Sequence, residues 1–288
     1  MTRTRQQNIE HLKDILENDQ GRFGNYQELP PLLFERIPEL EQIGSYFRKA
    51  TLPVDSPRYT WLREQLPDGL SSAIDIGANL GFFSLSLAAE YGIEATAYEQ
   101  LGIYSEACEA LADLAGLDDK VICRSGELIV DKLPEQLSVA DLSIHLSVLH
   151  HAGEVFDVDT VKKMGGWRAY ALETLHILGD KTSHLFFQTG NLLGGRPDLP
   201  VLFDGRETVP FIRQLLEDAG WTIEATGIVV EPETLKFATF GPQELDQAPS
   251  IWCRRDADSG LVAYFIGEEC IGRLATGHAQ RPLWFCKR

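Results

Sequence analysis

Two carboxylates and two glycines make up the first set of residues whose spacing indicates chemistry. Asp75 lies in the short apolar run 72–76, Gly77 and Gly81 follow it, and Glu99 comes 22 residues after Gly77. Glycine has no Cβ, so the backbone can bend sharply there and a ligand can approach it closely. A carboxylate at the end of the next strand can accept hydrogen bonds from both hydroxyls of a ribose. The pattern predicts a site for an adenosine-containing ligand.

Other nucleotide motifs do not fit this stretch. No lysine follows Gly81, which excludes the phosphate-binding loop of nucleotide hydrolases, and position 79 is Asn79, which excludes the dinucleotide fingerprint Gly-x-Gly-x-x-Gly. Glu99 by itself does not distinguish NAD from other adenosine ligands. An exposed acid at a strand end, with no ligand, is the alternative interpretation.

Two adjacent histidines, His150 and His151, follow the apolar run 140–149. A neutral imidazole there could remove a proton from a hydroxyl or an amine. Metal binding is disfavoured, because no cluster of further ligands accompanies the pair and neighbouring side chains on a helix point about 100° apart. A structural role for at least one histidine stays open. His145, within the apolar run, is expected in the core.

The elements that would position these residues alternate between strand and helix from residue 72 onward, which predicts an α/β fold with a parallel sheet. Short apolar runs predict strands at 72–76, 94–98, 120–124, within 140–149, and at 182–189, 222–230 and 251–255. Helical periodicity predicts helices at 82–91, 104–115, 160–178 and 207–219.

Residues 73–87 resemble motif I of the class I S-adenosylmethionine (SAM) methyltransferases, whose pattern is roughly acidic-x-Gly-x-x-x-Gly. The tail Ser147–His151 resembles the motif IV region of that family, and Ala219-Gly220-Trp221 looks like its entry to strand six. The resemblance covers roughly residues 70–255. It implies a seven-stranded Rossmann-like sheet in which the last strand runs antiparallel between strands five and six.

The resemblance also implies a set of site residues, with SAM as the cofactor. The residues expected to bind SAM are Asp75, Gly77, Ala78, Asn79, Gly81, Phe82, Glu99, Gln100, Ser125, Gly126, Glu127, Leu146 and Ser147. His150 and His151 are the candidate catalytic residues. Asn191 and Arg196, in the glycine-rich loop after strand five, are substrate candidates, with a simple flexible turn as the alternative.

Three parts are expected along the chain. An N-terminal helical cap (1–70) would hold helices at 1–20, 33–49 and 56–66, the SAM-binding core would span 71–255, and a C-terminal β extension would span 256–288. The extension would hold a hairpin at 262–274 and a strand at 282–287. Segments 250–255 and 282–288 look alike, so either could be the antiparallel strand. The aromatic residues of the cap, which either line a substrate pocket or anchor the core, are Tyr46, Phe47, Tyr59 and Trp61.

Bulk properties narrow the partners. The net charge is −17, which disfavours nucleic acid because phosphate contacts need a basic surface. The five cysteines are odd in number and lack Cys-x-x-Cys spacing, which argues against a disulfide framework and a zinc knuckle. No apolar run resembles a signal peptide or a membrane span, so a cytoplasmic location is expected.

The expected function is SAM-dependent O- or N-methylation of a small molecule by direct methyl transfer. Two alternatives stay open. One is an RNA methyltransferase that uses the basic residues near the C-terminus, which are Arg254, Arg255, Arg273, Arg281, Lys287 and Arg288. The other is a SAM-binding module without catalysis. The sequence determines neither the methyl acceptor nor the oligomeric state.

Overall fold

The computed structural model describes residues 4–18, 27–43, 54–255, 261–274 and 280–288. These residues form two compact units: Met1–Tyr59 with Asp68–Glu127, and Thr60–Pro67 with Leu128–Arg288. The units divide the chain differently from the predicted cap, core and extension. Each unit is therefore described by itself.

The first unit contains three parallel strands in the order β3-β2-β1. The strands are β1 (Ser72–Ile76), β2 (Glu94–Glu99) and β3 (Val121–Ser125), joined by helices α5 (Phe82–Tyr91) and α6 (Gly102–Ala115). These bounds match the predicted ones to within two residues. The predicted parallel α/β pattern is confirmed in this unit, and parallel strands have all their carboxyl ends at one edge of the sheet.

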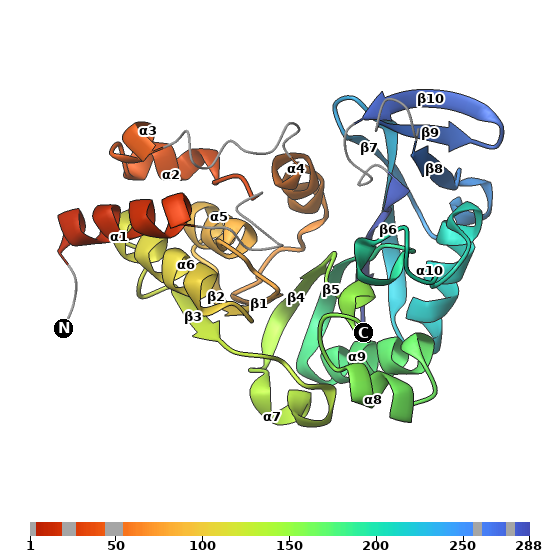
Figure 1. Cartoon of the computed structure of the whole chain (residues 1–288), viewed down its shortest axis with the longest axis horizontal. Coiled ribbons are helices and arrows are strands. Elements are labelled where there is room, and N and C mark those ends of the chain that lie inside the picture. The colour runs from red at the N-terminus through yellow and green to blue at the C-terminus, as the bar shows by residue number, and fades with distance from the viewer. Residues whose placement is uncertain (1–3, 19–26, 44–53, 256–260, 275–279) are drawn as a thin grey trace. The chain divides into compact units, whose positions relative to one another are not determined.

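The second of the predicted N-terminal helices is divided in two within the described residues. The structure has α1 (Arg5–Asn18), α2 (Pro31–Arg36) and α3 (Leu40–Ile43), so the single helix expected at 33–49 is wrong over its described part. Pro38 explains the break, because the residue before a proline is driven out of the helical region, and Ile37 has φ −128° and ψ 77°. Figure 1 shows α1 beside α6, where Arg5 Nη1 donates to the Leu114 carbonyl at 2.9 Å.

The aromatic residues expected in the cap behave as core anchors where they are described. Tyr59, in helix α4 (Asp55–Gln65), packs edge-on against Phe82 and Phe83 in the first unit. Trp61 stacks on Phe186 in the second unit with ring centroids 5.9 Å apart. Both side chains are buried. The other two aromatic residues of that prediction, Tyr46 and Phe47, lie outside the described residues.

The second unit contains five strands in the order β4-β5-β11-β6-β7. They are β4 (Ala140–Leu146), β5 (Thr182–Gln188), β6 (Thr222–Glu231), β7 (Lys236–Phe240) and β11 (Leu283–Lys287). β4 and β5 are parallel, whereas β11 runs antiparallel to both β5 and β6. This is the place that the methyltransferase resemblance implied for the last strand.

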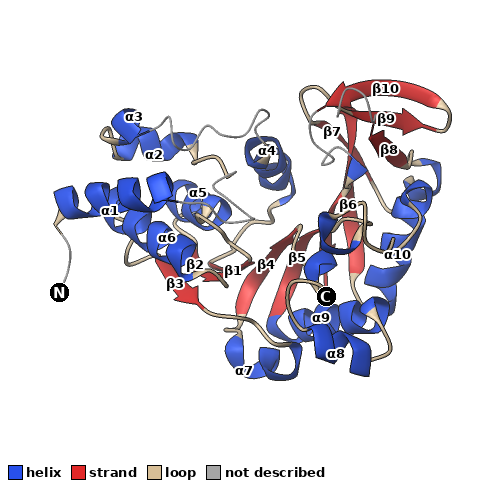
Figure 2. Cartoon of the chain, in the orientation of Figure 1, coloured by secondary structure: helices blue, strands red, loops and turns tan. Residues whose placement is uncertain are grey.

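Of the two look-alike segments, the C-terminal one forms that antiparallel strand. The other, β8 (Ile251–Arg255), pairs instead with β9 (Val262–Ile266), which pairs with β10 (Glu269–Leu274) in a separate three-stranded sheet. Figure 2 shows these three strands next to one another. The predicted hairpin at 262–274 is confirmed, and the predicted place of 251–255 as a strand of the core sheet is wrong.

Outside the small sheet, the described residues form three strands in the first unit and five in the second, eight against the seven predicted. The additional strand is β7, which pairs antiparallel with β6 and extends that side of the sheet. It lies in the segment that the sequence analysis left between two strands. The run Phe237–Phe240 has the aromatic and β-branched residues that favour a strand.

The helices of the second unit are α7 (Leu133–Gln136), α8 (Val158–Lys163), α9 (Trp167–Lys181) and α10 (Thr208–Asp218). The single helix predicted at 160–178 is wrong, because α8 and α9 are separated at Gly165 and Gly166. Their φ angles of 90° and 119° lie outside the helical region, which glycine tolerates and most residues do not. Helix α9 thus begins anew and packs on β5.

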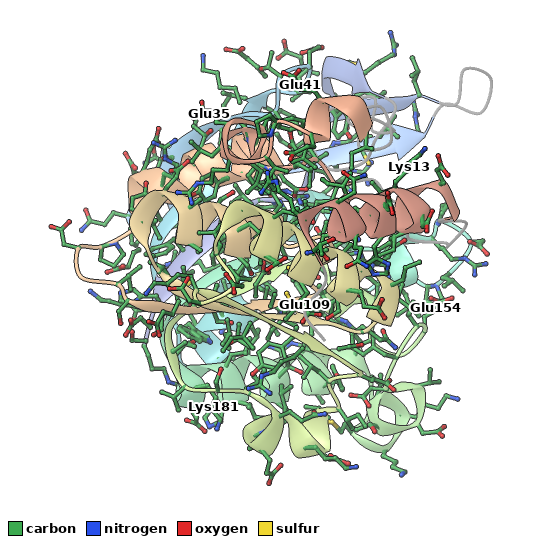
Figure 3. All side chains as sticks on the ribbon, turned by 90° about the vertical axis from the view of Figure 1, so that its left-hand side faces the viewer. Lys13, Glu35, Glu41, Glu109, Glu154 and Lys181 are labelled. Atoms are coloured by element: carbon green, nitrogen blue, oxygen red, sulfur yellow. The ribbon has the colours of Figure 1, made fainter. Side chains whose placement is uncertain are left out.

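Acidic side chains are spread over the surface of the first unit. Figure 3 shows Glu35, Glu41 and Glu109 on α2, α3 and α6, and all three are exposed. This distribution agrees with the net charge of −17. Among the described residues, no helix combines the length and apolar character needed to cross a membrane.

The two look-alike strands provide a test of the fold. Trp284 of β11 is fully buried, whereas Trp252 of β8 is partly exposed. We expect Trp284→Ala to lower the free energy of unfolding by about 3–5 kcal/mol, because a large buried ring leaves a cavity. Trp252→Ala should cost clearly less. Urea unfolding of both variants measures the difference, and equal losses would contradict the assignment of β11 to the central sheet.

Candidate functional site

The turn after β1 is fixed to the neighbouring strand. The backbone amides of Gly77 and Ala78 both donate to the carbonyl of Tyr98, at 2.9 and 3.0 Å. The φ angles are 71° at Gly77, 52° at Asn79 and 82° at Gly81. Two of these positions are glycine, and asparagine tolerates this left-handed region better than most residues. The sequence therefore matches a tight turn with its amides held in place.

Gly81 is required for a second reason. A Cβ at this position would lie 2.3 Å from the Sγ of Cys108 on α6. The turn can approach α6 this closely only without a side chain. Gly81 thus serves the packing of the turn on the helix, in addition to its backbone angle.

Glu99 closes the turn from the end of β2. Its Oε2 accepts a hydrogen bond from the Asn79 amide at 2.8 Å, and its Oε1 accepts from the Leu101 amide at 2.9 Å. Burial raises the pKa of Glu99, while these backbone amides and that of Gln100 oppose the rise. The structure thus brings together the first glycine turn and the strand-end acid that the sequence singled out.

The loop after β3 lies next to Glu99. Gly126 donates its amide to the Glu99 carbonyl at 3.0 Å, and Ser125 is the β3 partner of Glu99 in the register. Glu127, which follows, is exposed. Of the predicted cofactor residues in the first unit, Asn79, Glu99, Ser125 and Gly126 therefore lie together.

Two apolar residues beside Glu99 were not predicted. Leu101 and Ile103 are 38% and 40% exposed, although neither residue type favours water. They sit at the start of α6, directly after the acid. Exposed aliphatic side chains there could pack against a flat base.

Asp75 is buried, not open to a ligand. Its Oδ2 accepts a hydrogen bond from the Ser84 hydroxyl at 2.9 Å, in the first turn of α5. Burial raises the pKa of Asp75 to about 7; hydrogen bonds from Ser84 oppose the shift, and the charges of Asp55 and Glu99 add to it. A carboxylate at a helix N-terminus also interacts favourably with the helix dipole. Asp75 thus supports the turn from beneath.

Phe82 is also buried, and its ring packs against Tyr59 and Phe83. Its backbone amide donates to Gln27 Oε1 at 3.4 Å. Asp55 lies close by, and burial raises its pKa to about 6 against the opposing charge of Arg58. The side chain of Phe82 is therefore committed to the core of the first unit, and its predicted role in binding SAM stays a prediction.

Ser147, in the second unit, leaves β4 in the left-handed region, with φ 57°. Its hydroxyl donates to Gln188 Oε1 at 3.0 Å and accepts from Arg281 Nη1 at 3.1 Å. Gln188 in turn donates to the Arg281 carbonyl at 2.8 Å. Leu146, the last residue of β4, pairs with Gln188. This network fixes the point where the chain leaves β4 and connects it to β5.

His150 and His151 form a 3₁₀ turn with Leu149, and their rings lie 4.2 Å apart. His150 is 1% exposed, and its Nδ1 accepts the amide proton of Gly190 at 3.2 Å. An Nδ1 that accepts carries no proton, so a neutral His150 carries its proton on Nε2. The one ring nitrogen of neutral His150 that can accept a proton therefore already accepts the Gly190 amide. His151 is more exposed than His150, and the geometry distinguishes the two histidines.

His145 is 3% exposed and lies beside the ring of Phe187, as predicted for a core residue. Burial lowers the pKa of His145 to about 4. Across the parts of the chain that the structure describes, no group of three or more His, Cys, Asp or Glu side chains could hold a metal ion.

The two substrate candidates in the loop after β5, Asn191 and Arg196, have different surroundings. Arg196 forms ion pairs with Asp198 and, at 3.4 Å, with Glu154, and it is exposed. Asn191 instead lines a cavity. The glycine-rich run Gly190–Gly195 contains a 3₁₀ turn in which Gly194 and Gly195 have positive φ angles. Asn191 is connected to the histidine pair through its chain neighbour Gly190, whose amide donates to His150.

The fold is Rossmann-like. No protein-family model matches the chain, and no curated protein sequence does. Among solved structures, the chain is similar to the bifunctional kinase-methyltransferase WbdD, with 18% identity and a TM-score of 0.43 over 96% of this chain and 46% of that one. The chain thus spans less than half the length of WbdD.

Two further likenesses have similar scores. One is to a putative O-methyltransferase from Nostoc punctiforme PCC 73102, with 11% identity and a TM-score of 0.44, over 81% of this chain and 56% of that one. The other is to precorrin 8W decarboxylase from Methanobacterium thermoautotrophicum, with 14% identity and a TM-score of 0.42, over 83% and 92%. With scores this low, the function has to be inferred from the residues of this chain.

The raised pKa of Asp75 predicts a pH dependence of stability. An aspartate in an unfolded chain has a pKa near 3.9, so between about pH 4 and pH 7 the folded state binds the proton more tightly. The contribution of Asp75 to wild-type stability should therefore fall as pH rises through this window. Asp75→Asn removes this loss and keeps a partner for Ser84.

We expect the stability of Asp75→Asn relative to wild type to increase from pH 5 to pH 7 by on the order of 1 kcal/mol per pH unit and then level off. Urea unfolding at pH 5, 6, 7 and 8 measures this. Asp118→Asn, at an exposed position, is the control and should show no such trend. A difference for Asp75→Asn that does not vary with pH would contradict the buried acid.

Proposed function

We propose that the chain is a SAM-dependent methyltransferase that acts on an oxygen or nitrogen of a small molecule. The observation that carries this proposal is Glu99, whose carboxylate is held at the glycine turn by the amides of Asn79 and Leu101. The hydroxyls of a ribose can donate to such a carboxylate, and the glycine turn beside it lets the rest of the ligand approach the backbone closely.

The residues present fit an adenosine ligand. Each carboxylate oxygen of Glu99 accepts one backbone amide, and a carboxylate has about four acceptor sites in all. Acceptor capacity for two ribose hydroxyls therefore remains. Leu101 and Ile103 offer exposed aliphatic surface beside it, and Ser125 offers a hydroxyl. A hydroxyl donor to Glu99 would also favour its charged form, which burial disfavours.

The position of β11 supports SAM over NAD. The resemblance to class I methyltransferases implied an antiparallel last strand between strands five and six, and β11 lies antiparallel between β5 and β6. The turn also lacks the second glycine of the dinucleotide fingerprint, because Asn79 occupies its position.

When bound, SAM supplies an electrophilic methyl group. The residues of this chain align the acceptor, exclude water and hold the proton that the acceptor loses. His151 fits the role of base better than His150, because Nδ1 of His150 already accepts the Gly190 amide. His150 then acts as a positioning residue that holds the turn Leu149–His151 against the loop after β5.

Small molecules fit as acceptors better than nucleic acid. Arg281 is bonded to Ser147, Lys287 pairs with Glu224 at 2.8 Å, and Arg288 donates to the Ala219 carbonyl at 2.6 Å. Half of the six basic residues near the C-terminus therefore serve contacts within the second unit. With a net charge of −17, the chain offers little to attract phosphates.

Removing the carboxylate at the turn should weaken cofactor binding. We expect Glu99→Ala to reduce affinity for S-adenosylhomocysteine by about 1–3 kcal/mol, the contribution of hydrogen bonds to a charged group. Isothermal titration calorimetry measures the change. Glu94→Ala, at the exposed start of the same strand, is the matched control and should bind as wild type does. Equal affinity of Glu99→Ala and wild type would refute the ribose assignment.

The histidines should differ in their effects on methyl transfer. His151→Ala should bind S-adenosylhomocysteine normally and lose about 10²–10⁴-fold in turnover, the usual contribution of a general base. His150→Gln, which keeps an acceptor for the Gly190 amide, should retain most of the turnover. Transfer of labelled methyl from SAM to a panel of small hydroxy and amino compounds provides the assay. A larger loss in His150→Gln than in His151→Ala would reverse the assignment.

A further inference from the structure

A cavity of about 490 Å³ opens within the second unit, lined by the loop after β5 and by the small sheet. This volume is in the range of small-molecule sites in proteins. Phe203 and Val201 give it an apolar side, and Asn191, Arg206 and Gln280 give it a polar side. Neither the histidine pair nor the glycine turn lines it.

Trp252 cannot receive a ligand ring on its faces, because both are covered. Phe265 stacks on one face with centroids 4.5 Å apart, and the Arg206 guanidinium lies over the ring at 4.4 Å. The indole N–H donates to the Gly267 carbonyl at 2.8 Å. The Trp252 ring therefore has no free face on which a cationic ligand could bind, and it serves instead to position the Arg206 guanidinium.

Arg206 is the single cationic side chain among the described residues that line the cavity. The Trp252 ring positions the Arg206 guanidinium, whose planar set of N–H groups can donate to a carboxylate through two hydrogen bonds. Asp204 uses one carboxylate oxygen to accept the Arg206 backbone amide at 2.9 Å. That bond holds the turn from which Arg206 projects.

The side-chain oxygens of Asn191 and Gln280, the two amides that line the cavity, both accept hydrogen bonds. Gln280 Nε2 donates to Asn191 Oδ1 at 3.2 Å, and the Cys253 thiol donates to Gln280 Oε1 at 3.0 Å. The amide nitrogen of Asn191 is the donor left to serve a ligand. Asn191 and Arg206 supply donors for a ligand that only accepts, and the Asp204 carboxylate, which also lines the cavity, accepts the Arg206 backbone amide through one oxygen.

We infer that this cavity binds the carboxylate of a small ring-bearing acid, with Arg206 and Asn191 donating to the carboxylate and the ring lying against the apolar side that Val201 and Phe203 form. In terms of the proposed function, on which this part rests, that acid is the methyl acceptor. Asn191 follows Gly190, whose amide bonds His150, and Gln280 precedes Arg281, which bonds Ser147. Two cavity residues, Asn191 and Gln280, are therefore the chain neighbours of residues that bond His150 and Ser147.

Fluorescence of Trp252 tests the inference with benzoate as the probe. Of the five tryptophans, Trp252 is the partly exposed one, and the others are buried: Trp61, Trp167, Trp221 and Trp284. We expect benzoate to change the fluorescence saturably, and benzamide and benzylamine to bind at least about tenfold more weakly, since they lack the negative charge. Arg206→Gln should lose at least about tenfold in benzoate affinity.

Asn191→Asp is a second variant that keeps the oxygen for Gln280 and places a negative charge beside the ligand, so it should also lose at least about tenfold. Arg168→Gln, which removes an arginine elsewhere in the same unit, is the matched control and should bind benzoate as wild type does. Equal binding of benzoate and benzamide, unchanged affinity in both variants, or no saturable change would overturn the inference.

Calorimetry with S-adenosylhomocysteine on the same preparation separates this inference from the proposed function. Cofactor binding without benzoate binding overturns the carboxylate cavity alone. Benzoate binding without cofactor binding supports the cavity and overturns the proposed function.

Discussion

The glycine turn after β1 depends on one carbonyl oxygen. Tyr98 O accepts the amides of both Gly77 and Ala78, which ties the turn after β1 to the end of β2. The next amide, that of Asn79, then points at the carboxylate of Glu99, one residue beyond Tyr98. Turn and acid are therefore a single hydrogen-bonded structure.

Buried polar groups hold this structure from below and from the side. Asp75 bonds Ser84 at the start of α5, and Asp55 lies close enough to raise its pKa further. In the second unit, His150 does comparable work, since its ring accepts the Gly190 amide and fixes the loop after β5. Groups that look catalytic in a sequence can thus also serve as structural supports.

The sequence predicted the alternation of strands and helices because buried parallel strands and amphipathic helices have distinct periodicities. It also found Asn79 and Glu99, whose spacing reflects the length of one strand–helix–strand unit. It could not choose between 251–255 and 282–288 as the antiparallel strand, because both have similar residues and only long-range pairing separates them. Nor could it show that Asp75 and Phe82 point into the core, or that Arg206, Asn191 and Gln280 from distant segments line one cavity.

The central claim is that the Gly77–Gly81 turn and Glu99 hold the adenosine part of SAM. A crystal structure of the chain with S-adenosylhomocysteine tests it most directly. The account predicts ribose hydroxyls within hydrogen-bond distance of the Glu99 carboxylate, with the base between Leu101 or Ile103 and the loop at Ser125–Gly126. A ligand bound elsewhere, with Glu99 still bonded only to the amides of Asn79 and Leu101, would contradict it.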